Sequence, residues 1–162
     1  MKSPILRALM LGLPLALGGC GHRPAAPLPR GPAAPPSLLG DFIDDYGDRF
    51  TISATEWIQH PDSGYKNTAR YHIVRWDSAG QFLIAQNDSA NPGAGGRWSR
   101  IDWLPLTGMP PWNWAFCLSA YDAPTAQAAA ATTIARRDTP KTGCNGYPFS
   151  RMRRTGAEPR VR

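Results

Sequence analysis

The chain has 162 residues and a formal net charge of +6. The positive charge lies towards the two ends, because residues 38–149 hold nine Lys and Arg against eleven Asp and Glu. A nucleic-acid-binding domain carries a basic face on the fold itself, so this distribution argues against nucleic acid as a partner. The length leaves room for one small domain with its own hydrophobic core.

Residues 1–19 have the pattern of a secretory signal peptide. Lys2 and Arg7 supply positive charge, an apolar run follows over residues 8–17, and small residues precede Cys20. The run is about half the roughly 20 residues that a membrane-spanning helix needs. We therefore expect this segment to be removed after export rather than kept as an anchor.

The sequence Leu17-Gly18-Gly19-Cys20 resembles the lipobox of bacterial lipoproteins. The resemblance implies that the Cys20 thiol receives a diacylglyceryl group, that cleavage occurs before it, and that acyl chains hold the protein on a membrane. Gly18 departs from the family, in which Ala or Ser is commoner at that position. The family uses Asp after the Cys for inner-membrane retention, so Gly21 favours the outer membrane and leaves the face open. The alternative is an ordinary signal peptide with a chance Cys.

Residues 21–37 contain six prolines, which disfavour helix and sheet pairing. We expect residues 20–37 to form a lipidated, extended tether between the membrane and the domain.

Residues 38–150 are predicted to form one β-rich domain, since apolar and polar residues alternate at the period of a strand. Short connections between strands favour pairing of chain neighbours. The expected architecture is a six-stranded antiparallel meander, as a curved sheet or a small partly open barrel. The predicted strands are residues 39–43, 49–54, 69–76, 81–86, 98–104 and 112–121.

One helix is predicted at about residues 124–137, packed on the sheet. Alanine dominates this segment, and Thr125 or Asp122 can cap its start. Pro140 then prevents continuation of the helix. The polar, basic residues 151–162 are expected to be a disordered tail.

Cys117 and Cys144 remain as a pair if Cys20 is lipidated. Exported bacterial proteins meet an oxidising environment, in which two such cysteines usually form a disulfide. The alternative is that Cys117 is a catalytic nucleophile, which would need a nearby base.

Several segments resemble those of a group of small bacterial envelope lipoproteins, and the likeness covers about residues 39–152. That resemblance implies no particular activity. The predicted meander is also similar in architecture to lipocalin-like and avidin-like barrels, but a fold does not give a function. The segments that carry the resemblance are residues 83–88, 98–103, 116–130 and 143–149.

Tryptophans are the main candidates for ligand contact, because their flat faces suit sugars and apolar molecules. Trp112 and Trp114 are expected on one face, just after the loop at residues 109–111. Trp98 and Trp103 are expected on opposite faces of one strand, so Trp98 is a third candidate. The alternative is that these side chains fill the core.

The remaining residues with chemical potential give weaker patterns. The four Asp of residues 41–48 do not have the spacing of an EF-hand loop, and turns often use Asp for local hydrogen bonds. No recognised hydrolase, phosphate-binding or metalloprotease motif is present. We therefore expect no metal and no cofactor.

The sequence thus predicts a non-enzymatic envelope lipoprotein that binds a glycan or a small apolar ligand. The alternative is a structural lipoprotein that scaffolds or modulates an envelope protein or complex. A hydrolase is a more distant third, and it would require His72 to meet a carboxylate and a nucleophile in a cleft.

Overall fold

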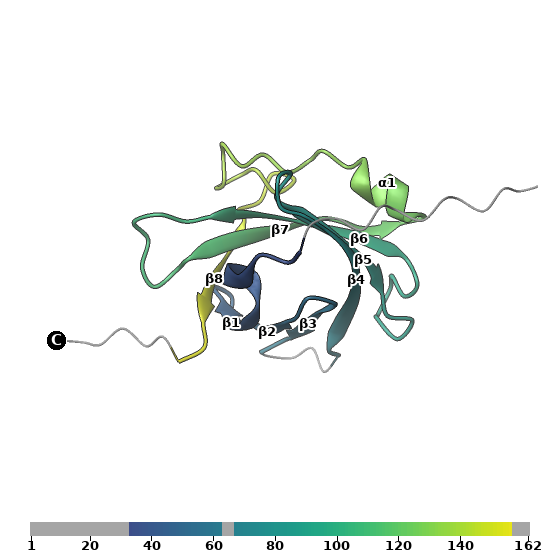
Figure 1. Cartoon of the computed structure of the whole chain (residues 1–162), viewed down its shortest axis with the longest axis horizontal. Helices are drawn as coiled ribbons and strands as arrows, with labels where there is room; N and C mark the ends of the chain where they lie inside the picture. Colours follow the sequence, from purple (N-terminus) through teal and green to yellow (C-terminus); the bar gives the residue numbers. More distant parts are fainter. Residues whose placement is uncertain (1–32, 63–66, 157–162) are drawn as a thin grey trace, which may run out of the picture.

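The computed structural model describes residues 33–62 and 67–156. The predicted signal peptide, Cys20 and the predicted tether as far as residue 32 lie outside these ranges, so what the sequence predicts for them is not tested by the structure. In the described part, strands wrap around one core, and α1 with the chain that follows it lies against the outside of the wall (Figure 1).

Eight antiparallel strands form a closed barrel in the order of the chain. β8 pairs with both β7 and β1, which closes the barrel. The elements are η1 (Pro36–Leu38), β1 (Gly40–Asp44), β2 (Arg49–Ile52), β3 (Glu56–His60), β4 (Ala69–Asp77), β5 (Phe82–Asn87), β6 (Trp98–Pro105), β7 (Trp114–Ala123), α1 (Ala126–Ala130) and β8 (Ser150–Arg154).

The prediction of a mainly β, antiparallel fold with one helix is confirmed, but the six-stranded meander and the partly open barrel are wrong. β3 was not predicted, because only Trp57 is buried in it and its apolar alternation is weak. β8 was not predicted either, because its residues 151–154 were assigned to the disordered tail. Met152 points into the core there while arginines flank it. Residues 151–154 are ordered because their backbone completes the hydrogen bonding of two neighbouring strands.

The helix is much shorter than the predicted segment of residues 124–137, since α1 covers only Ala126–Ala130. Its predicted cap is confirmed, because the Thr125 hydroxyl accepts a hydrogen bond from the Ala128 amide at 3.1 Å. Beyond the helix, Ala135 forms a β-bridge with Cys144. Tertiary contacts along the barrel wall therefore override the helix propensity of the sequence.

Aromatic side chains fill the barrel. Ring centroids of Trp57 lie 5.8 Å from Phe50, 5.9 Å from Trp114 and 5.2 Å from Phe116, and Phe42 lies 5.2 Å from Trp114. These pairs adopt edge-to-face geometry, which is favourable for aromatic rings. The centre of the fold is thus a packed core.

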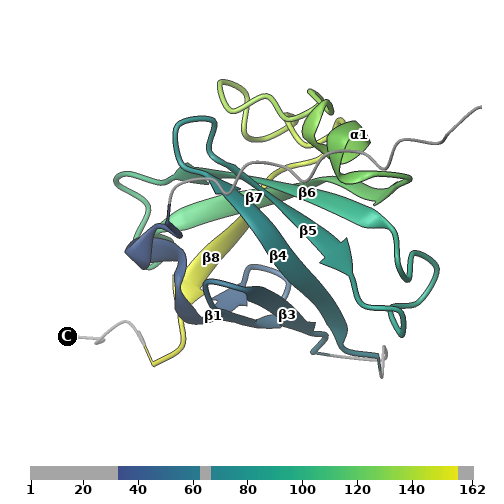
Figure 2. The same ribbon diagram turned by 45° about the vertical axis from the view of Figure 1, so that its right-hand side comes forward.

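One end of the barrel is covered by η1, where Leu38 is 3% exposed and joins the core (Figure 2). Residues 36–37 were predicted to belong to the extended tether, and this is wrong, because a 3-10 turn forms instead. Pro36 stands in the first turn, where its missing N–H costs nothing. Neither η1 nor α1, the helices of the described residues, is long and apolar enough to cross a membrane.

The chain between β7 and β8 forms an outer layer on the barrel. α1 packs against β5, β6 and β7, and its alanines contact Ile84. The predicted disulfide is confirmed, since Cys117 on β7 is bonded to Cys144 with a Cα–Cα distance of 5.5 Å. This bond ties residues 124–149 back onto the wall.

Candidate functional site

A large cavity lies outside the barrel, and we refer to it as the outer cleft. It has a volume of about 630 Å³ and is bounded by the β1–β2 turn, the loop between β6 and β7, and the end of the outer layer. Its lining residues are Asp45, Tyr46, Leu106, Met109, Ala115, Pro140, Lys141, Pro148, Phe149 and Arg151.

The floor of the outer cleft is apolar and fixed. Ala115 on β7 is 1% exposed and Phe149 is 3% exposed, and both belong to a small core cluster with Cys117. The amide of Phe149 donates a hydrogen bond to the carbonyl of Pro140 at 2.9 Å, so two parts of the outer layer hold each other in place.

The rim of the outer cleft exposes large apolar side chains. Tyr46 is 68% exposed and Met109 is 41% exposed. The Met109 carbonyl accepts a hydrogen bond from the Trp112 amide at 2.8 Å, and the Leu106 amide donates to the Asn113 carbonyl at 2.9 Å. These bonds give the β6–β7 loop a defined shape, so Met109 is presented by an ordered turn.

A buried carboxyl supports the turn that carries Tyr46. Asp44 Oδ1 accepts hydrogen bonds from the amides of Tyr46 and Asp48, each at 2.9 Å. Burial raises the pKa of Asp44 to about 6, although the two amides oppose the rise; the negative charges of Asp48 and Asp45 add to it. The turn is therefore built on a group that titrates in mildly acidic solution.

The charged groups of the outer cleft are unequally satisfied. The Asp45 carboxylate accepts hydrogen bonds from the Arg151 guanidinium, at 2.8 Å, and from the Arg151 backbone amide, at 3.0 Å. The same guanidinium lies 5.2 Å from the centre of the Trp112 ring. Lys141 is exposed and has no hydrogen-bond or ion-pair partner within residues 33–62 and 67–156. The outer cleft thus contains the Asp45–Arg151 ion pair and a second cation, Lys141, which has no partner among the described residues.

A second cavity, the mouth pocket, lies at the end of the barrel under η1. Its volume is about 260 Å³, and Trp103 and Trp114 form its inner walls. The indole N–H of Trp114 is buried and has no acceptor among the described residues. The other lining residues are Ser37, Leu38, Gln81, Pro105 and Asn113.

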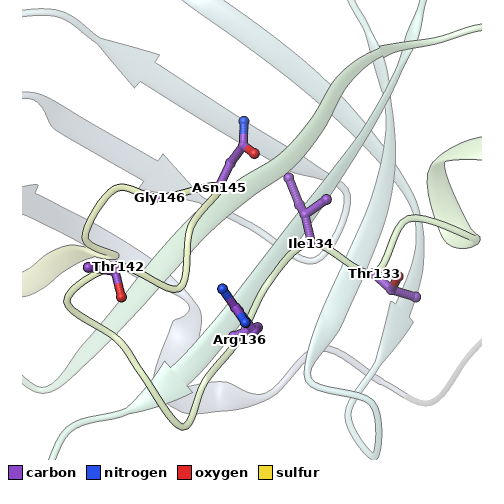
Figure 3. A pocket seen from close by; sticks show the side chains of 6 residues that line it. All are labelled: Thr133, Ile134, Arg136, Thr142, Asn145 and Gly146. Atoms are coloured by element: carbon purple, nitrogen blue, oxygen red, sulfur yellow. The ribbon is translucent and has the colours of Figure 1, made fainter.

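A third cavity of about 320 Å³ lies in the outer layer and is lined by residues on both sides of Cys144. Figure 3 shows that its side chains come from two neighbouring stretches, residues 133–136 and 142–146. The Arg136 amide joins them by donating to the Gly143 carbonyl at 2.8 Å. This cavity is shallow, and polar and apolar groups line it about equally, so it offers less apolar area to a ligand than the outer cleft.

Comparison of the chain with protein-family models, curated proteins and solved structures finds no match. The geometry of these cavities is therefore the basis for a functional assignment.

The structure does not bring the three predicted tryptophans together. Trp114 is 3% exposed inside the barrel, whereas Trp112 packs beside the outward-facing Arg151. The two do not form one rim, because β7 begins only at Trp114 and Trp112 belongs to the preceding loop. Trp98 lies on the outer face, partly buried beside α1, and Trp103 faces the core, so their predicted opposite orientation is confirmed.

The acidic turn uses its carboxylates for local hydrogen bonds. Besides the bonds of Asp44 and Asp45, Asp41 accepts from the Thr51 hydroxyl at 2.8 Å, and Asp48 accepts from the Gln59 amide group at 2.7 Å. Within the described ranges, no group of three or more acidic, His or Cys side chains is arranged to hold a metal ion.

His72 meets two carboxylates on the surface of β4. Its ring nitrogens lie 3.5 Å from Glu56 and 3.0 Å from Asp88. The Ala90 amide and then His72 lower the pKa of Asp88. His72 lines none of the three cavities.

Sequence reasoning missed the outer cleft. Met109 was noted only as part of a loop, and Tyr46 only as part of a turn. Lys141 and Phe149 lie in a segment that has no periodic pattern. Cys144 was the one available signal, since a disulfide to Cys117 brings this segment onto β7.

Proposed function

We propose that this chain is a lipid-anchored envelope lipoprotein whose domain binds a small, mainly apolar ligand in the outer cleft. The anchor is the expected lipid on Cys20, and the outer membrane is the expected location. The domain acts by binding and has no enzymatic role in this proposal.

The observation that carries the binding role is the outer cleft itself. Small-molecule sites usually have volumes of about 300–1,000 Å³, apolar walls and a few polar groups. The outer cleft has a volume of about 630 Å³, an apolar floor at Ala115 and Phe149, and charged groups at its edge. The mouth pocket, at about 260 Å³, lies below this size range.

A structural or interaction lipoprotein is the second candidate, and the packed interior favours it. A barrel filled by Trp57, Trp114 and Phe116 offers a partner its outside only. Exposed Tyr46 and Met109 would then contact an envelope protein rather than a small molecule.

A fluorescent apolar probe separates the two candidates. We would titrate N-phenyl-1-naphthylamine, an uncharged probe that brightens in apolar sites, into protein that begins at Gly21. The barrel core is contributed by residues 34–152, so this form retains the complete described fold. We expect saturable binding of about one probe per chain.

The variant Met109→Glu places a charge at the apolar rim and should weaken probe binding about tenfold, because the charge is poorly solvated beside the bound probe. Val74→Glu is the matched control, since Val74 is 43% exposed and does not line the outer cleft. Failure of the probe to bind, or equal effects of both variants, would contradict the ligand-binding proposal and favour the interaction role.

A further inference from the structure

We infer that the ligand of the outer cleft is an anionic amphiphile, such as a long-chain carboxylate, whose head is bound by Lys141. This inference rests on the proposed ligand-binding function and specifies the chemical class of the ligand.

The first argument is the charge of the outer cleft. Its charged lining residues are Asp45, Lys141 and Arg151, which gives a net charge of +1. Asp45 and Arg151 satisfy each other through two hydrogen bonds, at 2.8 and 3.0 Å. Lys141 is therefore the residual positive charge, and an anionic group complements it.

The second argument is the separation of polar and apolar surface. Lys141 lies at the exposed edge, whereas Phe149 and Ala115 form the buried floor, and Leu106 and Met109 add apolar walls. A ligand that satisfies both regions has a charged head and an apolar body. Burial of the methylene groups of such a body on this floor is favourable.

The third argument is size. A volume of about 630 Å³ lies near the middle of the range for small-molecule sites. An amphiphile with an alkyl chain of about a dozen carbons is a ligand of this class.

Two probes with the same apolar body test the role of the head group. 8-Anilino-1-naphthalenesulfonate carries a sulfonate on the framework of uncharged N-phenyl-1-naphthylamine. We expect Lys141→Gln to weaken the anionic probe about fivefold, as for an exposed charge pair of about 1 kcal/mol, and to leave the uncharged probe unchanged. The loss should shrink in high salt.

Arg97→Gln is the matched control, because Arg97 is an exposed cation of the β5–β6 loop that does not line the outer cleft. Its variant should bind both probes like the wild type. In competition, dodecanoate should displace the anionic probe at lower concentration than dodecanol or dodecyltrimethylammonium.

The outcomes distinguish the two proposals. If the uncharged probe binds but Lys141→Gln leaves the anionic probe unaffected, or dodecanol competes as well as dodecanoate, the anionic head is wrong while the apolar site stands. If neither probe binds, both the site and its ligand class are wrong.

Discussion

Arg137 in the outer layer donates a hydrogen bond to Asp102 of β6 across 2.5 Å, and the side chain of Asp102 is almost completely buried. Arg137 also donates to the backbone carbonyls of Trp103, Gly80 and Gln81. One side chain thus connects the outer layer to β6 and to the turn between β4 and β5.

Replacement of Arg137 by Met should lower the free energy of unfolding by about 3 kcal/mol, because the buried carboxylate of Asp102 loses one of its two arginine partners. The loss is limited, since Asp102 keeps Arg100 at 2.8 Å and the Ser119 hydroxyl at 2.5 Å. Urea denaturation measures the change. Arg136→Met is the control, as Arg136 is exposed; equal losses for the two variants would show that the ion pair is not responsible.

Removal of the disulfide by Cys117→Ala with Cys144→Ala should cost about 3.5 kcal/mol of stability in the chain-entropy model, for a sequence separation of 27 residues. The same change frees the segment that carries Lys141 and Phe149, so the affinity for the uncharged probe should also fall. Denaturation and probe titration of oxidised, reduced and double-variant protein test both effects. A reduced protein that keeps full probe affinity would show that the disulfide does not hold the cleft wall.

The free energy of unfolding should decrease as the pH rises towards 7, because burial raises the pKa of Asp44. The pKa of this carboxyl is about 6 in the folded protein against an ordinary value of 3.8, so the folded state holds a proton that the unfolded chain releases. The resulting stabilisation is fully present below pH 3.8 and is lost as the pH rises through 6. The largest difference is about 3 kcal/mol.

Asp44→Asn removes this titration but keeps a side-chain oxygen that can accept hydrogen bonds from the backbone amides of Tyr46 and Asp48. Relative to the wild type, the variant should gain stability between pH 4 and pH 7, as measured by urea denaturation at several pH values. Asp122→Asn, at an exposed position on β7, serves as the control. Parallel pH profiles for wild type and Asp44→Asn would contradict the role of Asp44.

Lipidation is tested at Cys20. Cells grown with radiolabelled palmitate should label the wild-type protein, and Cys20→Ala should abolish the label, because only the thiol accepts the lipid. Cys144→Ala provides a comparison that removes a different cysteine. No label on the wild type, or equal label on Cys20→Ala, would rule out the lipoprotein assignment.

The sequence predicted those strands in which apolar and polar residues alternate over several positions. The bounds of the predicted segments 69–76 and 81–86 each lie within one residue of those of β4 and β5. β3 and β8 were missed because each buries a single large side chain, Trp57 or Met152. Their pairing depends on neighbouring strands rather than on their own pattern.

The sequence also failed to predict the outer cleft, because its walls come from three loops whose residues are far apart in the chain. Tyr46, Met109 and Lys141 have no shared spacing, and only closure of the barrel and the disulfide places them around one cavity. The sequence predicted Trp98, Trp112 and Trp114 as ligand contacts, but the side chain of Trp114 is part of the hydrophobic core.

The sequence by itself determined the β class, the cap of α1 and the pairing of Cys117 with Cys144, because these follow from local alternation, local hydrogen bonding and a short inventory of cysteines. Only the tertiary structure decided that the sheet closes, that the helix ends at Ala130, and that the outer cleft forms outside the barrel. Those features depend on contacts between residues distant in the chain, which no local pattern encodes.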